Sequence, residues 1–199
     1  GAKLPPGAPA APALPEDARA ILERRTREHP EDPRHHFHLG LLLEATHAED
    51  RVKSSHAKHF QHAVTGEPSN PHYRYFLALA LKADVAMSAE REENRIRQEL
   101  EEALRLFPRH AAAARELAWY YSRTTINLHK ALVFGERAAR IGEGSVVSRV
   151  LYAELLKAAG LNAPMEIENQ EIARRFPDHP LVLAREAQRA MERNRFEEG

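Results

Sequence analysis

The sequence predicts an all-α fold in which pairs of helices repeat along the chain as a solenoid. Similar segments begin near residues 30, 68, 108, 143 and 177 of the 199 residues, at spacings of 34 to 40. Self-similarity at a period of this size is typical of solenoids. Within each copy, apolar residues recur at the three- and four-residue spacing of an amphipathic helix, so the segments are predicted to be helical.

Residues 1–15 precede the first copy and differ from the rest in composition. Residues 4–15 contain five of the thirteen prolines and no charged side chain, a composition that favours extended backbone and builds no core. We interpret residues 1–15 as a Pro/Ala-rich linker or N-terminal tail and residues 16–199 as the repeat domain. A lone helix is expected around Glu16–His29 and another around Pro180–Asn194, with the helix pairs between them.

The copies align on a landmark residue and on a small residue. The segments HPEDPRHHFHLGLLLEA from His29 and EPSNPHYRYFLALALKA from Glu67 share both of their prolines. The segments FPRHAAAARELAWYYSR from Phe107 and FPDHPLVLAREAQRAME from Phe176 follow the same register, whereas the fourth copy has Glu143 at the landmark. The small residues, which allow the next helix to approach closely, are Gly40, Ala78, Ala118, Ala153 and Ala187.

This combination of small residues, large apolar neighbours and a closing proline resembles the tetratricopeptide repeat (TPR) family over about residues 16–194. At the position where that family usually has tryptophan, the chain has His36, Arg74, Ala114 and Arg149. The resemblance implies a right-handed α-solenoid of helix–turn–helix repeats, in which the first helix of each repeat lines a concave groove. It also implies a function in protein–protein interaction.

The composition excludes several classes of function. Lys plus Arg and Asp plus Glu number 29 each, so no basic surface for nucleic acid is expected. No segment approaches the roughly 18 apolar residues of a membrane span, so no direct membrane insertion is expected. Cysteine is absent, and no nucleophile elbow, P-loop, HExxH or dinucleotide-binding loop occurs. We therefore expect a protein that is not an enzyme, with no catalytic residue and no cofactor.

The groove implied by the resemblance has specific candidate residues. Placing the register of the copies on the first helices gives this set: Arg34, Phe37, Leu41, His72, Tyr75, Leu79, Arg115, Trp119, Val147 and Val150, with Lys157 beyond them. Aromatic and arginine side chains carry much of the binding energy at protein interfaces, and such a groove suits a peptide or an amphipathic helix. The alternative is that Phe37, Tyr75 and Trp119 pack against neighbouring repeats as core.

Histidines are concentrated in the first part of the chain, where nine of the twelve lie between His29 and His72. Helical spacing makes His35, His38, His56, His59 and His62 candidate ligands for zinc or nickel. Successive members of the 56, 59, 62 series drift by about 60° around a helix, however, so they do not all face one ion. The alternative is that these are partly exposed surface histidines, with His36 and His56 as polar residues of the core.

Taken together, these observations predict a non-catalytic scaffold that binds a peptide or an amphipathic helix of a partner protein in its groove, as part of a larger, bacterial-type protein. An assembly protein that self-associates through the ends of its solenoid, as a homo-oligomer, is the alternative of a different class. A histidine-based metal-binding module is the third.

Overall fold

The computed structural model describes residues 16–46, 54–84, 90–123, 125–141 and 145–197. The predicted linker at residues 1–15 and the landmark Glu143 lie outside these ranges. The described residues form α-helices and one short 3-10 helix, with no strand among them, and the chain divides into two compact units, Gly1–Ser88 and Ala89–Gly199. We describe each unit by itself.

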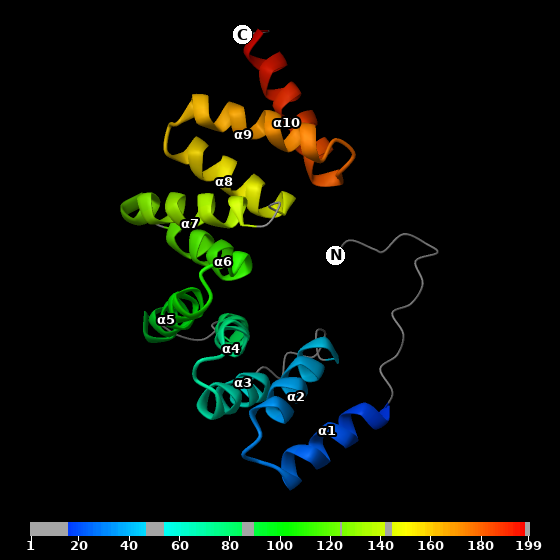
Figure 1. Ribbon diagram of the computed structural model, residues 1–199. Coiled ribbons are helices and arrows are strands. Elements are labelled where there is room, and N and C mark those ends of the chain that lie inside the picture. The colour runs from blue at the N-terminus through cyan, green and yellow to red at the C-terminus, as the bar shows by residue number, and fades with distance from the viewer. Residues whose placement is uncertain (1–15, 47–53, 85–89, 124, 142–144, 198–199) are drawn as a thin grey trace. The chain divides into compact units, whose positions relative to one another are not determined.

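The first unit contains four described helices, each of which packs on the next (Figure 1). They are α1 (Glu16–Glu28), α2 (Pro33–Thr46), α3 (Ser54–Gly66) and α4 (Pro71–Asp84). Gly40 of α2 shows why a small residue is needed: a Cβ atom there would lie 2.9 Å from Cε1 of the Phe60 ring on α3. Phe60 is itself fully buried. The close approach of α2 to α3 therefore depends on the absence of a side chain at Gly40, where the Phe60 ring packs.

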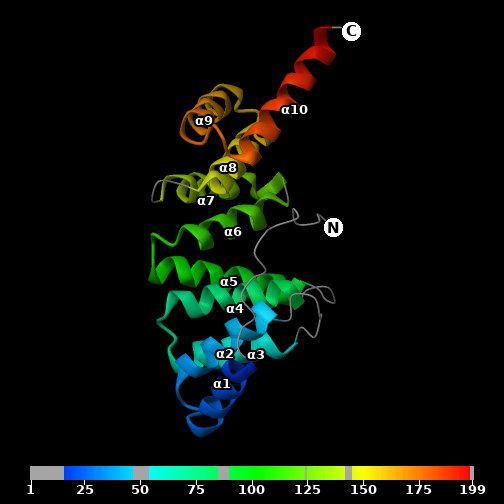
Figure 2. The same ribbon diagram turned by 90° about the vertical axis from the view of Figure 1, so that its right-hand side faces the viewer.

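The second unit stacks six described α-helices and the 3-10 helix η1 (Figure 2). They are α5 (Glu90–Leu106), α6 (Ala111–Ser122), η1 (Thr125–Asn127), α7 (Leu128–Arg140), α8 (Val146–Ala158), α9 (Asn162–Arg175) and α10 (Pro180–Glu197). Alanines fill the contacts between neighbouring helices, and Ala118, Ala131 and Ala138 are fully buried. Gly135 of α7 is buried against Leu155 of α8, where a Cβ atom would lie 2.6 Å from Cδ1.

Four of the five sequence landmarks lie in one recurring turn between helices. In each of these turns, the carbonyl of the residue before the landmark proline accepts a hydrogen bond from the N–H group three residues later. The pairs are His29 and Asp32, Glu67 and Asn70, Phe107 and His110, and Phe176 and His179. Proline suits the second position of such a turn because its φ angle is already fixed near the required value. The prolines thus mark the turns between successive repeats.

The last residue of each of these turns also starts the following helix. Side-chain atoms of Asp32, Asn70, His110 and His179 accept hydrogen bonds from backbone N–H groups at the helix start. Proline follows Asp32, Asn70 and His179 at the first helical position, where its missing N–H costs nothing. One short motif therefore closes one helix pair and starts the next.

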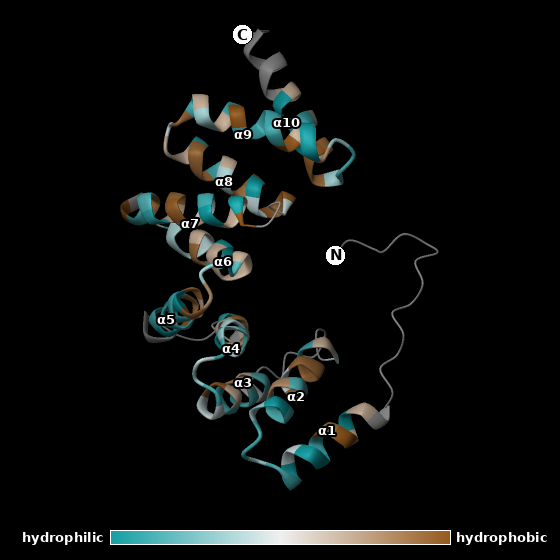
Figure 3. Cartoon of the chain, viewed as in Figure 1, coloured by the Kyte–Doolittle hydropathy of each residue, from teal (hydrophilic) through white to brown (hydrophobic). Residues whose placement is uncertain are grey.

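The described helices carry both hydrophilic and hydrophobic residues (Figure 3). The buried side chains are mostly alanine and leucine, with Phe60, Leu77 and Leu117 as the largest that are fully buried. No helix in the described ranges is long and apolar enough to cross a bilayer.

Candidate functional site

The predicted groove residues of the first unit lie on α2 and α4, and Arg34 is the most exposed of those on α2. Its guanidinium group donates hydrogen bonds to both carboxylate oxygens of Asp32, at 2.7 and 3.0 Å. These bonds lower the pKa of Asp32 below its ordinary value. Arg34 is thus already paired with a carboxylate. Leu41, seven residues later on the same helix, is half-buried.

Phe37 of α2 packs in an aromatic cluster with residues of α3 and α4. Its ring centroid lies 4.7 Å from that of Tyr73, 5.4 Å from Phe76 and 5.8 Å from Phe60. Aromatic pairs at these separations add to the stability that burial provides. Phe37 is half-buried, and these three rings cover part of its surface.

The three predicted groove residues of α4 differ in exposure. His72 is exposed, whereas Tyr75 and Leu79 are half-buried. The Tyr75 ring meets that of Phe76 edge-on at 5.4 Å. In the first unit, therefore, the predicted groove offers the partly covered faces of Tyr75 and Leu79 rather than fully exposed anchors.

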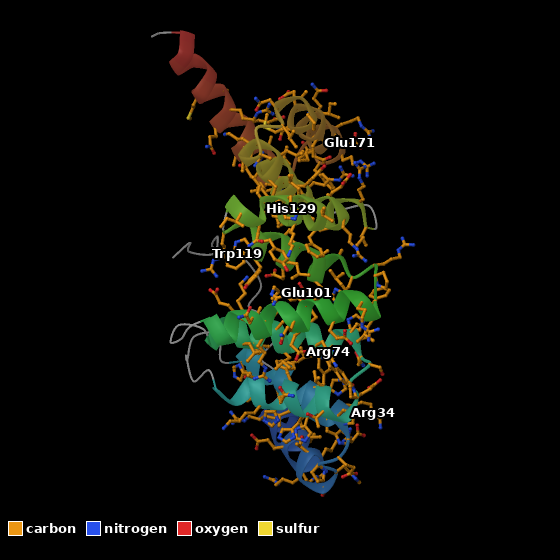
Figure 4. All side chains as sticks on the ribbon, turned by 90° about the vertical axis from the view of Figure 1, so that its left-hand side faces the viewer. Arg34, Arg74, Glu101, Trp119, His129 and Glu171 are labelled. Carbon is orange, nitrogen blue, oxygen red and sulfur yellow. The ribbon has the colours of Figure 1, made fainter. Side chains whose placement is uncertain are left out.

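In the second unit, two predicted groove residues are large, apolar and exposed. Trp119 of α6 is 43% exposed and Val147 of α8 is 49% exposed, and the two helices are in contact. The side chain of Trp119 is labelled in Figure 4. The Arg123 guanidinium lies 5.8 Å from the centroid of the Trp119 ring, within the range of a cation–π interaction. Arg123 also forms an ion pair with Glu93 at 2.8 Å.

The other two predicted residues of the second unit are more covered. Arg115 is half-buried and lies 3.5 Å from a carboxylate oxygen of Glu116. Val150 packs against the hydrophobic cluster formed by Val146, Ala153, Ile172 and Val182. Of the ten predicted groove positions, Trp119 and Val147 are the ones that present large apolar surface.

The histidines proposed as metal ligands point to different partners. His56 lies 4.0 Å from a carboxylate oxygen of Glu44, and His38 is exposed. His35 approaches His29, with ring centroids 5.9 Å apart. Among the described residues, no three His, Asp or Glu side chains lie close enough to hold a metal ion.

His59 and His62 instead meet His36, which was not a member of the candidate metal set. The Nδ1 atoms of His36 and His59 are 3.2 Å apart, and the rings of His36 and His62 stack with centroids 4.7 Å apart. Burial lowers the pKa of His36 and of His59. His36 is buried, so the expectation of a polar core residue applies to it.

Polar side chains at the family's usual tryptophan position bind other parts of the fold. Arg149 is buried, and its Nη1 donates a 2.7 Å hydrogen bond to the carboxylate of Glu168 on α9. The Nε of Arg74 donates to the carbonyl of Pro68 at 2.8 Å. At the position where the family usually has tryptophan, these two arginines therefore make polar contacts: Arg149 within its helix pair, and Arg74 to the preceding turn.

A hydrogen-bonded group on α5 and α6 was not expected from the sequence. The Tyr121 hydroxyl donates to Glu101 at 2.7 Å, and Arg97 donates to both oxygens of the same carboxylate. Burial, together with the Glu101 carboxylate, raises the pKa of Tyr121 to about 12. The group joins the two helices through a charge-assisted hydrogen bond.

An open cavity of about 210 Å³ lies among α8, α9 and α10 and was also not expected. Side chains from all three helices line it, among them Glu154, Lys157, Asn169, Arg185 and Arg189. The only sequence signal for it is indirect: polar residues of α9 and α10 occupy positions that face a neighbouring helix. The cavity is therefore the second candidate binding feature of the second unit.

Comparison with known proteins gives similarity in structure without similarity in sequence. No family model matches the chain, and no curated protein matches it. MamA (residues 41 to the end) from Desulfovibrio magneticus RS-1 is similar at a TM-score of 0.66 and 15% identity, over 84% of this chain and 89% of that one.

Two further solved structures are similar to the same degree. TTC0263, a thermophilic TPR protein of Thermus thermophilus, has a TM-score of 0.65 and 18% identity over 87% of this chain and 89% of its own. YrrB, described as a TPR protein with an unusual peptide-binding site, has a TM-score of 0.65 and 14% identity over 81% of this chain and 77% of its own. These similarities confirm the fold class predicted from the sequence. The chain therefore has the all-α solenoid fold of tetratricopeptide-repeat proteins.

Proposed function

We propose that the protein is a non-catalytic interaction scaffold that binds a peptide or an amphipathic helix of a partner protein. The surface that takes the partner is formed by first helices of the repeats and includes α6 and α8. Binding there requires no chemistry of the chain itself. It depends on shape and on apolar anchors presented by a preformed scaffold.

The observation that carries this proposal is the exposure of Trp119 together with Val147. Tryptophan buries more area than any other side chain, and it is enriched at the centres of interfaces. Most large apolar side chains of α6 and α8 are covered, whereas these two, on helices in contact, remain about half exposed. Large apolar side chains left exposed on two helices in contact are a feature that a partner protein can cover.

The comparison with YrrB supports the same class of function, because that protein is described as having a peptide-binding site. At 14% identity, the two proteins share the fold. The residues proposed to bind are side chains that this chain's own fold leaves exposed.

The test uses Trp119 as its own reporter, since it is the single tryptophan of the chain. Peptides selected on the intact protein from a displayed library are titrated against it while tryptophan fluorescence is recorded. Binding that covers Trp119 shifts its emission to shorter wavelength. Trp119→Ala, which has no tryptophan and is therefore titrated by calorimetry, is expected to weaken these peptides by about 1–3 kcal/mol with an unchanged circular-dichroism spectrum.

Ile167→Ala is the matched control, because Ile167 is 68% exposed in the same unit but lies on α9, the second helix of its pair. It should leave the affinity unchanged. Peptides that bind without moving the Trp119 emission, and that bind Trp119→Ala as well as the unaltered chain, would place the partner on another surface and exclude this proposal.

Self-association is a second candidate, favoured by the apolar residues of α10. Leu183 is 51% exposed and Met191 is 67% exposed. If this face joins copies of the chain, the mass measured by sedimentation rises with concentration and the rise is lost in Leu183→Lys. Val133→Lys, at a residue 61% exposed on α7, is the control. A single monomer mass at all concentrations would exclude this candidate.

A further inference from the structure

Helix α1 has the place of a second helix in a pair, and α10 has the place of a first helix. Helix α1 precedes the turn at Pro30, as α3 precedes the turn at Pro68. Helix α10 follows the turn at Pro177, as α2 follows the turn at Pro30. Within the ranges that the structure describes, neither helix has the other half of its pair. Each is therefore expected to present a face that a helix covers in the other pairs.

Two complete helix pairs show which positions of a first and a second helix meet. In α2 and α3, the Nδ1 atoms of His36 and His59 are 3.2 Å apart. In α8 and α9, Arg149 donates a 2.7 Å hydrogen bond to Glu168. In both pairs, the residue of the first helix lies six positions after one landmark, and the residue of the second helix lies nine positions before the next landmark. These two positions therefore face each other within a pair.

The same two positions of α10 and α1 hold exposed aliphatic residues. Leu183 lies six positions after Pro177, and Ile21 lies nine positions before Pro30. The side chain of Leu183 is 51% exposed and that of Ile21 is 42% exposed. The equivalent residues of α2, α3, α8 and α9 are ionisable and pair with each other. An aliphatic residue has no group that matches them, so Leu183 and Ile21 suit each other.

The small residue of the first helix gives a second match. The ring of Phe60, eight positions before Pro68, packs at Gly40 of its own pair. The equivalent residues of the two terminal helices are Ala187, which is exposed, and Leu22, which is half-buried. Phe60, with a helix on either side of it, is fully buried. Leu22 against Ala187 would again set a large side chain against a small one, which close packing of two helices requires.

We propose that α10 of one molecule pairs with α1 of a second copy, so that the two chains together complete a helix pair. Leu183 then packs on Ile21, and Ala187 packs on Leu22. This inference rests on the self-association described as the second candidate function, and it names the surface that α10 meets. The two surfaces are different, so the contact is head-to-tail and each added copy offers the same two surfaces again. The assembly therefore does not stop at a dimer.

The composition of α10 favours α1 over a second α10 as the occupant of its exposed face. Ala184, Ala187 and Ala190 are all exposed. Two copies of this face set against each other would oppose alanine to alanine, whereas interdigitated packing places larger side chains opposite small ones. Ile21 and Leu22 of α1 supply those larger side chains.

The experiment uses two variants of the intact chain, each blocked on one surface. Ile21→Lys blocks α1 and Leu183→Lys blocks α10, and their circular-dichroism spectra should be unchanged because both residues are exposed. In sedimentation, the mass of the unaltered chain should rise with concentration beyond that of a dimer, whereas each variant alone should stay at 22.5 kDa. An equimolar mixture of the variants should reach twice this mass and no more. The one junction without lysine then joins α10 of the first variant to α1 of the second.

The outcomes separate this inference from the two candidate functions. Ile167→Lys, at an isoleucine 68% exposed on α9, and Trp119→Ala should both associate like the unaltered chain, so a failure of the peptide surface is distinguishable. If Ile21→Lys associates while Leu183→Lys does not, self-association stands but α1 is not the partner, and the inference is overturned. A mixture that stays monomeric or grows past the dimer also overturns it. A monomer mass for the unaltered chain at all concentrations overturns both the inference and self-association.

Discussion

His36 of α2 and His59 of α3 face each other through their Nδ1 atoms at 3.2 Å, and only one of these atoms carries a proton in the neutral pair. The Nε2 of His36 lies 3.1 Å from the carbonyl of Pro30. Because a carbonyl only accepts, this Nε2 carries the proton of His36, and its Nδ1 is the acceptor. His59 is then the donor. Protonation of His36 would put two N–H groups opposite each other.

The first prediction is therefore a loss of stability in acid. His36 and His59 have lowered pKa values in the folded state, so below about pH 6.5 the unfolded chain binds more protons. His62, stacked on His36, adds repulsion when charged, whereas Glu23 opposes the shift at His59. The contribution of the neutral His36–His59 pair to stability is fully present above about pH 6.5. It is lost as the pH falls through the lowered pKa values of the two histidines.

Thermal unfolding across this pH range measures the effect. His36→Gln should flatten the dependence on pH, and His38→Gln, at an exposed position of the same helix, should not. An equal slope in His36→Gln and the unaltered chain would show that the His36–His59 pair does not cause it.

The second prediction concerns the close contact between α2 and α3. Gly40→Ala adds a Cβ atom 2.9 to 3.2 Å from three atoms of the Phe60 ring, and this ring is fixed by stacking on Phe76 with centroids 5.8 Å apart. Overpacking of a core costs about 1–3 kcal/mol, which exceeds the gain of about 0.8–1 kcal/mol in helix propensity. We expect a net loss of about 1 kcal/mol in the free energy of unfolding, measured with urea.

Phe60→Leu provides the control for this mechanism, because it removes the ring atoms that the new methyl group meets. Gly40→Ala should then be less destabilising in the Phe60→Leu background than alone. If Gly40→Ala stabilises the unaltered chain, the Phe60 ring moves aside for the new methyl group and the prediction is wrong.

The third prediction concerns the buried ion pair between α8 and α9. The side chains of Arg149 and Glu168 are 10% and 13% exposed. Arg149→Met leaves the carboxylate without its partner and should cost about 3–5 kcal/mol in urea unfolding. The double variant Arg149→Met/Glu168→Leu should recover most of this loss, because apolar residues of similar size replace a buried pair at little cost. A double variant as unstable as the single one would contradict this account.

The fourth prediction is a late-titrating tyrosine. The pKa of Tyr121 is raised from 10.0 to about 12, so its contribution to stability is present below about pH 10 and is lost as the pH rises toward 12. An absorbance titration of the five tyrosines should lose its last step in Tyr121→Phe. Tyr120→Phe, on the neighbouring residue, should retain that step.

The fold was predictable from the sequence because its signals are local. A proline at the second turn position, a capping residue two places later and a small residue in the helix that follows all act within one repeat. Pro30, Pro68, Pro108 and Pro177 accordingly lie in equivalent turns. The helix predicted at Glu16–His29 is observed at Glu16–Glu28, and that predicted at Pro180–Asn194 is observed at Pro180–Glu197.

The candidate sites were harder to predict because they depend on how helices face each other. Phe37 fits a groove position by register, but rings on α3 and α4 cover it. The spacing of His56, His59 and His62 is visible in the sequence, whereas the partner of His59 lies on another helix, 23 residues earlier. The cavity depends on Asn169 and Arg185 meeting across two helices. The spacing of residues within one helix does not predict which side chains meet across two helices.

The polar contacts inside the helix pairs also give each repeat an identity. His36 pairs with an imidazole on the second helix of its pair, α3, whereas Arg149 pairs with a carboxylate on the second helix of its own pair, α9. If α3 and α9 exchanged places during folding or between two chains, Arg149 would face His59 and Glu168 would face His36, and the buried arginine would lose its counter-charge. Helix pairs that have the same backbone fold therefore differ in the side chains that each helix needs from its partner helix. This mismatch opposes the misassembly and swapping to which repeat arrays are prone.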